Sequence, residues 1–287
     1  MLQYDFMVNA FAAAGIVGVV AAVAGYFLVL RGQVFAGHAL SHVGFAGATG
    51  AVLVGVAPLY GLLVFTVAAG TAMGVLGERL ARRDVAIGMV LAFSLGLGML
   101  FVSVYTAYAS QTTALLFGNI LAVDRGTLWA LVGLGVVCLG LLAAIARPLL
   151  FASLHAELAE ARGVPLRLVG GLFLLAAAVA VAESAQVVGV LLVFALMVGP
   201  PAAAQRLTGS IGAGVALAAV LAVAEAWAGI ALAYWSDGPT SFWITAVSAA
   251  VYGASLAAGP ATRRRARTGD GHGHDHAHLH SADAARG

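Results

Sequence analysis

Residues 10–30 read AFAAAGIVGVVAAVAGYFLVL, an apolar run without a charge, and a transmembrane helix needs ~20 such residues. The run is too long for the apolar part of a cleaved signal, so we expect a retained first span. Of the 287 residues 62% are hydrophobic and 9% are charged, whereas a soluble domain carries about 25% charged residues. The surroundings of most of this chain must therefore be lipid, which predicts an all-α, polytopic membrane bundle.

The same pattern recurs along the chain and predicts about nine spans. Their approximate ranges are 10–30, 38–57, 60–78, 86–106, 126–146, 167–183, 186–206, 211–234 and 242–259. We expect residues 1–262 to form one transmembrane domain. Residues 263–287 are polar, contain no apolar run and predict a disordered tail.

Arginine positions predict the orientation of these spans. The loop after the third span carries Arg79, Arg82 and Arg83, and cytoplasmic loops of membrane proteins are rich in basic residues. If that loop is inside, alternation also places inside Arg31, Arg147, Arg162, Arg167, Arg206 and the cluster at 263–267. Only Arg125 then falls outside. We expect an external N-terminus and a cytoplasmic C-terminus in the cell membrane.

Two segments between spans have a character of their own. The apolar stretch Ala114–Val123 is too short to cross a bilayer and predicts a re-entrant or interfacial segment. Ala156–Arg162 contains good helix formers, and Gly163 with Pro165 forms a stop signal. We expect either a short cytoplasmic helix at the membrane surface or a solvated connector.

Two histidines at the start of the second predicted span form a candidate metal site. His38 and His42 are four residues apart in GHALSH, so they share one helix face. Paired imidazoles are common ligands of zinc-like ions. No H-E-x-x-H is present, which excludes the usual metalloprotease base. Alternatively, both are core histidines hydrogen-bonded to the backbone or to Ser41.

Two carboxylates and a proline pair fall within later predicted spans. Glu183 lies at the predicted outer end of the sixth span, where it could reach external water, and Glu225 lies inside the eighth. An intramembrane carboxylate attracts a cation, relays a proton or makes a helix–helix hydrogen bond. Gly199, Pro200 and Pro201 predict a kink, which is either a packing feature or a broken helix lining a transport pathway.

The tail contains HGHDHAHLH, a low-complexity stretch that suits loose metal binding on a flexible chain. Its histidines are His272, His274, His276, His278 and His280. The segment is either a cytoplasmic metal buffer or sensor, or low-complexity drift without a role. A purification tag is a further alternative, against which the intervening residues argue.

The chain contains no lysine. It therefore lacks a P-loop, which requires a lysine, and any ATP must be bound by another polypeptide. Its single cysteine, Cys138, cannot form an internal disulfide. The formal net charge of +2 gives no reason to expect nucleic acid as a partner.

Five segments in order resemble the permease subunits of manganese/zinc-type ABC importers. They are RGQVFAGHALSHVGFAGATGA at 31–51, LLFGNILAV at 115–123, ELAEARGVP at 157–165, AQVVGVLLVFALMVGPPAAAQRL at 185–207 and YWSDGPTSFWI at 234–244. The first resembles the family stretch R-x-x-x-F-x-G-D-A-L-S-H-A. His42 matches the family's histidine, while His38 replaces its aspartate. That all-nitrogen pair suits zinc better than manganese.

The resemblance implies a homodimer of permeases, a cytoplasmic ATPase, an external metal-binding protein and no permanently bound cofactor. The transported ion is then zinc or manganese, with His38 and His42 on its path. The resemblance also implies that a short helix docks on the ATPase. Its residues are Ala156, Glu157, Leu158, Glu160, Arg162 and Gly163.

Other functions remain open from the sequence. A proton-coupled metal exporter fits the histidine-rich tail, but nine spans and few intramembrane aspartates argue against it. A permease for a chelated metal, such as a siderophore or corrinoid, is a second alternative. An intramembrane hydrolase using His38 or His42 lacks a partner nucleophile in a recognisable motif.

Overall fold

A computed structural model describes residues 3–76, 83–104 and 115–259 of the chain. Every long element in these ranges is a helix, and nine of them have 18 or more residues. They are α1 (Asp5–Leu30), α2 (Val34–Leu53), α3 (Pro58–Leu76), α4 (Arg83–Val104), α6 (Arg125–Leu154), α8 (Leu166–Val188), α9 (Val190–Leu207), α10 (Ile211–Ser236) and α11 (Thr240–Ala258). The short elements are the 3₁₀ turn η3 (Ile120–Ala122) and α7 (Ala156–Ala161).

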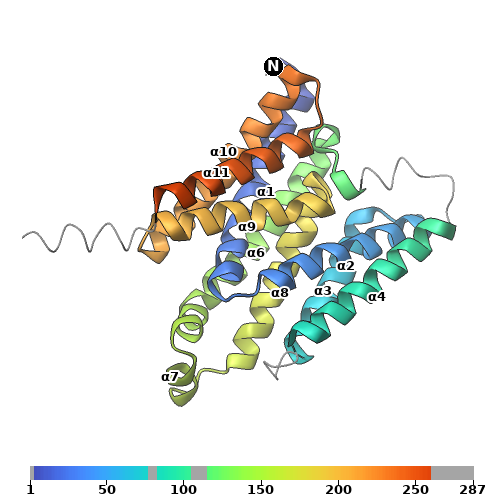
Figure 1. The fold of residues 1–287 in the computed structure, drawn as a ribbon. Coiled ribbons are helices and arrows are strands. Elements are labelled where there is room, and N and C mark those ends of the chain that lie inside the picture. The colour runs from blue at the N-terminus through green and yellow to red at the C-terminus, as the bar shows by residue number, and fades with distance from the viewer. Residues whose placement is uncertain (1–2, 77–82, 105–114, 260–287) are drawn as a thin grey trace, which may run out of the picture.

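The helices form two packed groups (Figure 1). Helix α1 packs against α6, α8, α9 and α10, and α11 closes this group against α9 and α10. The second group consists of α2, α3 and α4, joined to the first mainly through α3 and α8. Most residues of α1 and α8 are buried, whereas α4 and α11 expose most of theirs. The core therefore lies around α1 and α8.

The outer surface is apolar, as a lipid environment requires. On α4 the exposed side chains include Met89, Phe93 and Met99, and on α6 they include Trp129 and Val136. Six of the described helices are long and apolar enough to cross a membrane, and α3 and α9 contain shorter apolar stretches. The prediction of an all-α membrane bundle with about nine spans is confirmed.

Several predicted span ends differ from those of the observed helices. The second helix begins at Val34 and ends at Leu53 rather than covering 38–57, because the turns at Gly32 and Gly55, both with positive φ, lie just before and just after it. The fifth span continues to Leu154 instead of ending near 146, with Pro148 inside the helix. Proline costs one backbone hydrogen bond but does not terminate a helix that packing holds on either side.

The segment 115–123 does not cross the bundle. After a helical turn at 115–117, Gly118 adopts a positive φ and η3 follows. Ile120 and Val123 are buried in the main core, and the side-chain amide of Asn9 donates to the carbonyl of Val123 at 3.3 Å. The segment therefore covers the end of the bundle at which α1 begins.

The opposite end of the bundle gathers arginines. Arg31, just after α1, donates to the hydroxyl of Ser153 at 3.1 Å near the end of α6, and the guanidinium lies 5.5 Å from the centre of the Phe173 ring. Helix α7 follows directly, and Arg206 lies in the last turn of α9. The side chain of Gln205 reaches the carbonyl of Tyr26 at 2.9 Å, which places the end of α9 at this same end. Arg125 begins α6 at the other end. In the folded bundle Arg31 and Arg206 therefore lie at one end and Arg125 at the opposite end.

Candidate metal path

His38 and His42 lie within α2, on one face. Their ring centroids are 4.7 Å apart with the planes nearly perpendicular, at 85°, and both side chains are half-buried. Ser41 points into the bundle and donates to the carbonyl of Gly37 at 3.1 Å. Its single hydroxyl hydrogen is therefore committed to its own helix and is not donated to either imidazole.

A cavity lies beside this pair. The ring of Phe194 on α9 packs edge-on against His38, with centroids 5.1 Å apart. Phe194 also lines a cavity of about 340 Å³ between α9 and α11, whose other walls include Val198, Ser248 and Tyr252. The cavity is mostly apolar, and Ser248 supplies one of its few polar atoms. Phe194 therefore lies between the histidine pair on α2 and the cavity between α9 and α11.

One protomer does not complete a metal site at the pair. Within the described ranges no cluster of three or more histidine, cysteine, aspartate or glutamate side chains could hold an ion. A structural zinc site takes four ligands, so His38 and His42 supply at most half of such a set. A second pair would have to come from another molecule.

The proline pair does not break α9. The helix runs unbroken through Pro200 and Pro201, and the break lies earlier, at Gly189, where α8 ends and α9 begins. Because proline lacks an N–H, Pro201 frees the carbonyl of Met197. Gly25 on α1 packs directly against that carbonyl, and a Cβ at Gly25 would overlap it. The carbonyl that Pro201 frees therefore lies at a close α1–α9 contact.

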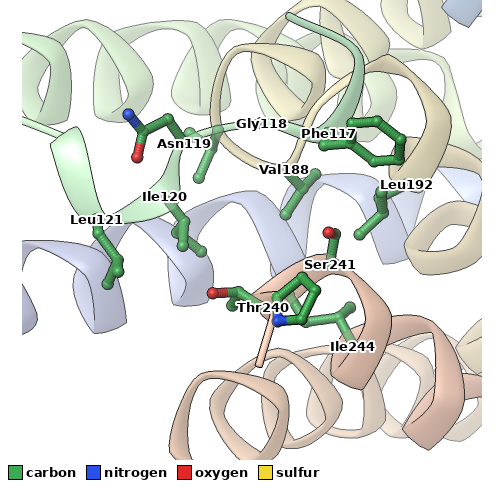
Figure 2. Close-up of a pocket in the computed structure, with 12 residues that line it drawn as sticks. Phe117, Gly118, Asn119, Ile120, Leu121, Val188, Leu192, Thr240, Ser241 and Ile244 are labelled. Atoms are coloured by element: carbon green, nitrogen blue, oxygen red, sulfur yellow. The ribbon is translucent and has the colours of Figure 1, made fainter. Parts of the chain in front are cut away.

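A second cavity, of about 220 Å³, lies at the end where α1 begins. Figure 2 shows the 117–121 segment and the α8–α9 junction on one side of it and the start of α11 on the other. Its lining includes Gly118, Ile120, Val188, Thr240 and Ser241. Three of the segments that resemble the importer family therefore meet at this cavity, although they lie far apart in the sequence.

Helix α7 stands out at the arginine end. Ala159 is buried and anchors it, whereas Glu157, Leu158, Glu160 and Arg162 are exposed. Gly163 ends the helix with a φ of 77°, as the stop signal predicted. The prediction of a short helix rather than a connector is confirmed, and its exposed side is free to meet a partner.

Glu183 does not reach external water, contrary to the sequence-based expectation. The side chain is fully buried, and neither carboxyl oxygen has a hydrogen-bond partner. It faces Gly135 of α6, where an added Cβ would lie 3.3 Å from the carboxyl oxygen. The expectation failed because α8 runs on to Val188, which places Glu183 more than a turn inside the helix.

Glu225 is buried in α10, with 1% of its surface exposed. Ser248 of α11 is close enough to interact with its carboxyl group, yet neither carboxyl oxygen makes a hydrogen bond of normal geometry. The helix–helix hydrogen bond considered from the sequence is therefore not formed by Glu225. Ser248 instead donates to the carbonyl of Ala195 on α9 at 3.3 Å.

Comparisons with known proteins identify the family. The ABC 3 transport family matches residues 3–259. The chain belongs to this family. It is 31% identical to a manganese transport system membrane protein of Halalkalibacterium halodurans over 231 residues, which covers 80% of this chain and 79% of that protein. A manganese import system permease of Streptococcus parasanguinis is 28% identical, covering 91% and 94% of the two chains.

A solved structure extends the similarity to three dimensions. The PsaBC assembly of Streptococcus pneumoniae, in complex with an antibody fragment, superimposes with a TM-score of 0.82 at 26% identity, covering 93% of this chain and 96% of that one. The protein is thus a multi-span permease of the manganese/zinc-type ABC importer family, and its relatives are permease subunits rather than enzymes.

Several features of this ABC 3 permease were not predicted from the sequence. The sequence did not mark Phe194 or Ser248 as functional residues, because an aromatic residue or a serine is ordinary in a membrane helix. Gly189 belongs to a recognised segment, but its role as the α8–α9 break was not foreseen. The five tail histidines lie outside the described residues.

Proposed function

We propose that this permease imports a divalent transition-metal ion, with zinc the first candidate and manganese the second. The observation that carries the proposal is the pair His38 and His42, two half-buried imidazoles on one face of α2. Ionisable side chains inside a membrane bundle generally mark a transport path. Nitrogen ligands favour zinc, whereas the relatives named above are manganese transporters by name.

The path is completed by a homodimer. One protomer offers two nitrogens among its described residues and no third ligand. A two-fold axis beside α2 would bring two pairs together and give up to four nitrogens, the number that zinc prefers. Transport also requires release, so the full set need form in only one conformation.

Energy comes from a separate cytoplasmic ATPase that docks on α7. The chain has no lysine and hence no P-loop, and α7 presents its charged side chains at the arginine end. The positive-inside rule makes that end cytoplasmic. An external metal-binding protein would then deliver the ion to the opposite end, near the α10–α11 connection, with the N-terminus outside.

The histidine-rich tail follows α11 and would lie on the cytoplasmic side. We infer that it binds released metal loosely, because five closely spaced imidazoles can supply three or four ligands at once. Deletion of residues 269–287 should lower zinc binding and weaken inhibition of uptake by cytoplasmic zinc. Equal binding and equal inhibition in the truncated protein would remove this role.

The decisive experiment uses the complete importer in proteoliposomes and measures uptake of zinc and of manganese. His42→Ala should abolish uptake while the permease still assembles with its ATPase. His38→Asp should raise the ratio of manganese to zinc uptake, because it restores an oxygen ligand. Uptake at the wild-type rate by the His38→Ala, His42→Ala double variant would exclude the site.

A further inference from the structure

Glu225 is the buried acid that the proposed path does not yet use. Its carboxyl group lies in the middle of α10, a helix of 26 residues, with both oxygens shielded from solvent and without a hydrogen-bond partner. Burying such a group unsatisfied is costly. Intramembrane carboxylates of this kind pair with a cation or with another polar group in some state of the protein.

Two further oxygen-bearing groups, from two other helices, lie beside this acid. The hydroxyl of Ser248 on α11 interacts with Glu225 of α10 and donates to the carbonyl of Ala195 on α9 at 3.3 Å. Gly199 makes room for it, because a Cβ there would overlap the hydroxyl oxygen. A serine hydroxyl has only one hydrogen, so while Ala195 receives it, Ser248 leaves an ionised Glu225 without a donor.

This oxygen cluster, formed by Glu225, Ser248 and the Ala195 carbonyl, adjoins the cavity that Phe194 separates from the histidine pair. Ser248 and Ala195 are in the lining of the 340 Å³ cavity. Phe194, on the same wall, contacts His38. An ion that passed from the imidazoles around Phe194 into this cavity would meet the Ser248 hydroxyl and the Ala195 carbonyl, which line it, and Glu225 lies next to Ser248.

We propose that Glu225, Ser248 and the carbonyl of Ala195 form a second binding site for the transported divalent cation, which receives the ion from His38 and His42. Carboxylate and carbonyl oxygens suit manganese, and zinc also accepts a carboxylate. Two sites in series let a path bind an ion firmly enough to select it and still release it. This inference rests on the proposed import function and adds the step after the histidine pair.

Glu183 provides a matched control within the same chain. It is equally buried and equally without hydrogen-bond partners. However, its neighbours on α6 are Gly135 and Cys138. Neither of them lines one of the two cavities described above, whereas Ser248 beside Glu225 lines the 340 Å³ cavity. A general effect of neutralising a buried acid would appear in both glutamine variants, whereas loss of a cation site would appear only at Glu225.

The test combines binding and transport. Equilibrium binding of radioactive Mn²⁺ is measured on the purified full-length permease, and Mn²⁺ and Zn²⁺ uptake on the complete importer in proteoliposomes. Glu225→Gln should lose about one Mn²⁺ per protomer and about tenfold or more in uptake, because it removes the only charged ligand. Glu183→Gln should match the wild type in both. Tail binding is common to all variants and cancels in the comparison.

The outcomes separate the two proposals. If the wild type imports metal and Glu225→Gln equals Glu183→Gln in both binding and uptake, the second site is overturned and the import function stands. If Glu225→Gln fails to assemble with the ATPase, Ser248→Ala is the variant that tests the second site. Its Mn²⁺ affinity should be several-fold weaker than that of the wild type. An unchanged affinity would overturn the inference. His38→Ala, His42→Ala should stop uptake yet keep the Mn²⁺ equivalent that Glu225 binds.

Discussion

Gly118 and Gly189 pack backbone against backbone at the end of the bundle where α1 begins. A Cβ on Gly118 would overlap the backbone of Val188 and Gly189, and a Cβ on Gly189 would overlap the amide of Gly118. Both residues have positive φ, at 77° and 83°. The LFGN turn is therefore set directly against the junction of α8 and α9, so any movement of that junction must move the turn as well.

Alanine at Gly118 should destabilise the protein through two separate effects. A positive φ costs an L-residue about 1–2 kcal/mol, and the overlap with α8 adds to it. Gly55→Ala isolates the first effect, because Gly55 has a φ of 75° and nothing within 4 Å of an added Cβ. Thermal unfolding in detergent should show a clearly larger fall in Tm for Gly118→Ala. Equal shifts in the two variants would mean that the close contact contributes nothing.

Gly199 and Ser248 should be coupled in stability. Gly199→Ala places a methyl group on the hydroxyl oxygen of Ser248, whereas the Ser248 Cβ is 3.5 Å from that methyl position, an ordinary contact. The double variant Gly199→Ala, Ser248→Ala should therefore recover much of the stability lost in Gly199→Ala, with a coupling energy of about 1–3 kcal/mol. Additive losses, measured as Tm shifts of the four proteins in the cycle, would contradict the geometry.

The orientation is tested by cysteine labelling with an impermeant maleimide. Cys138 is buried, so the native thiol should stay silent. Tyr4→Cys, at an exposed position, should react in intact cells, and Glu160→Cys on α7 should react only after the membrane is opened. Labelling of Glu160→Cys from outside would invert the topology and remove α7 from the cytoplasm.

Helix α7 should transmit the conformational change of the ATPase. Replacing residues 156–163 by a Gly/Ser linker removes the helix and the Ala159 anchor, so ATP hydrolysis should no longer drive uptake. A milder variant, Glu157→Arg with Glu160→Arg, changes only exposed charges and should lower uptake several-fold while the permease remains folded. Full uptake with the flexible linker would show that the ATPase engages another part of the chain.

The sequence located the elements well and their ends less well. Apolar length identified the long helices, and Gly163 marked the end of α7. The extension of α6 to Leu154 was missed because hydropathy falls before the helix ends. Glu183 was placed near water for a similar reason: its depth depends on where α8 stops and on what covers that end.

By itself the sequence determined that this chain spans a membrane repeatedly, that its arginines favour one end, and that two histidines share a helix face. These properties depend on residue type and spacing along one helix, which are local. Tertiary structure alone decided that His38 meets Phe194, that Ser248 stands between Glu225 and Ala195, and that Gly118 seats against Gly189. Helices such as α1 and α2 are apolar on every side, so their sequences do not distinguish a face that meets lipid from one that meets protein. Close packing of small residues between helices determines which face of a helix meets protein and which meets lipid.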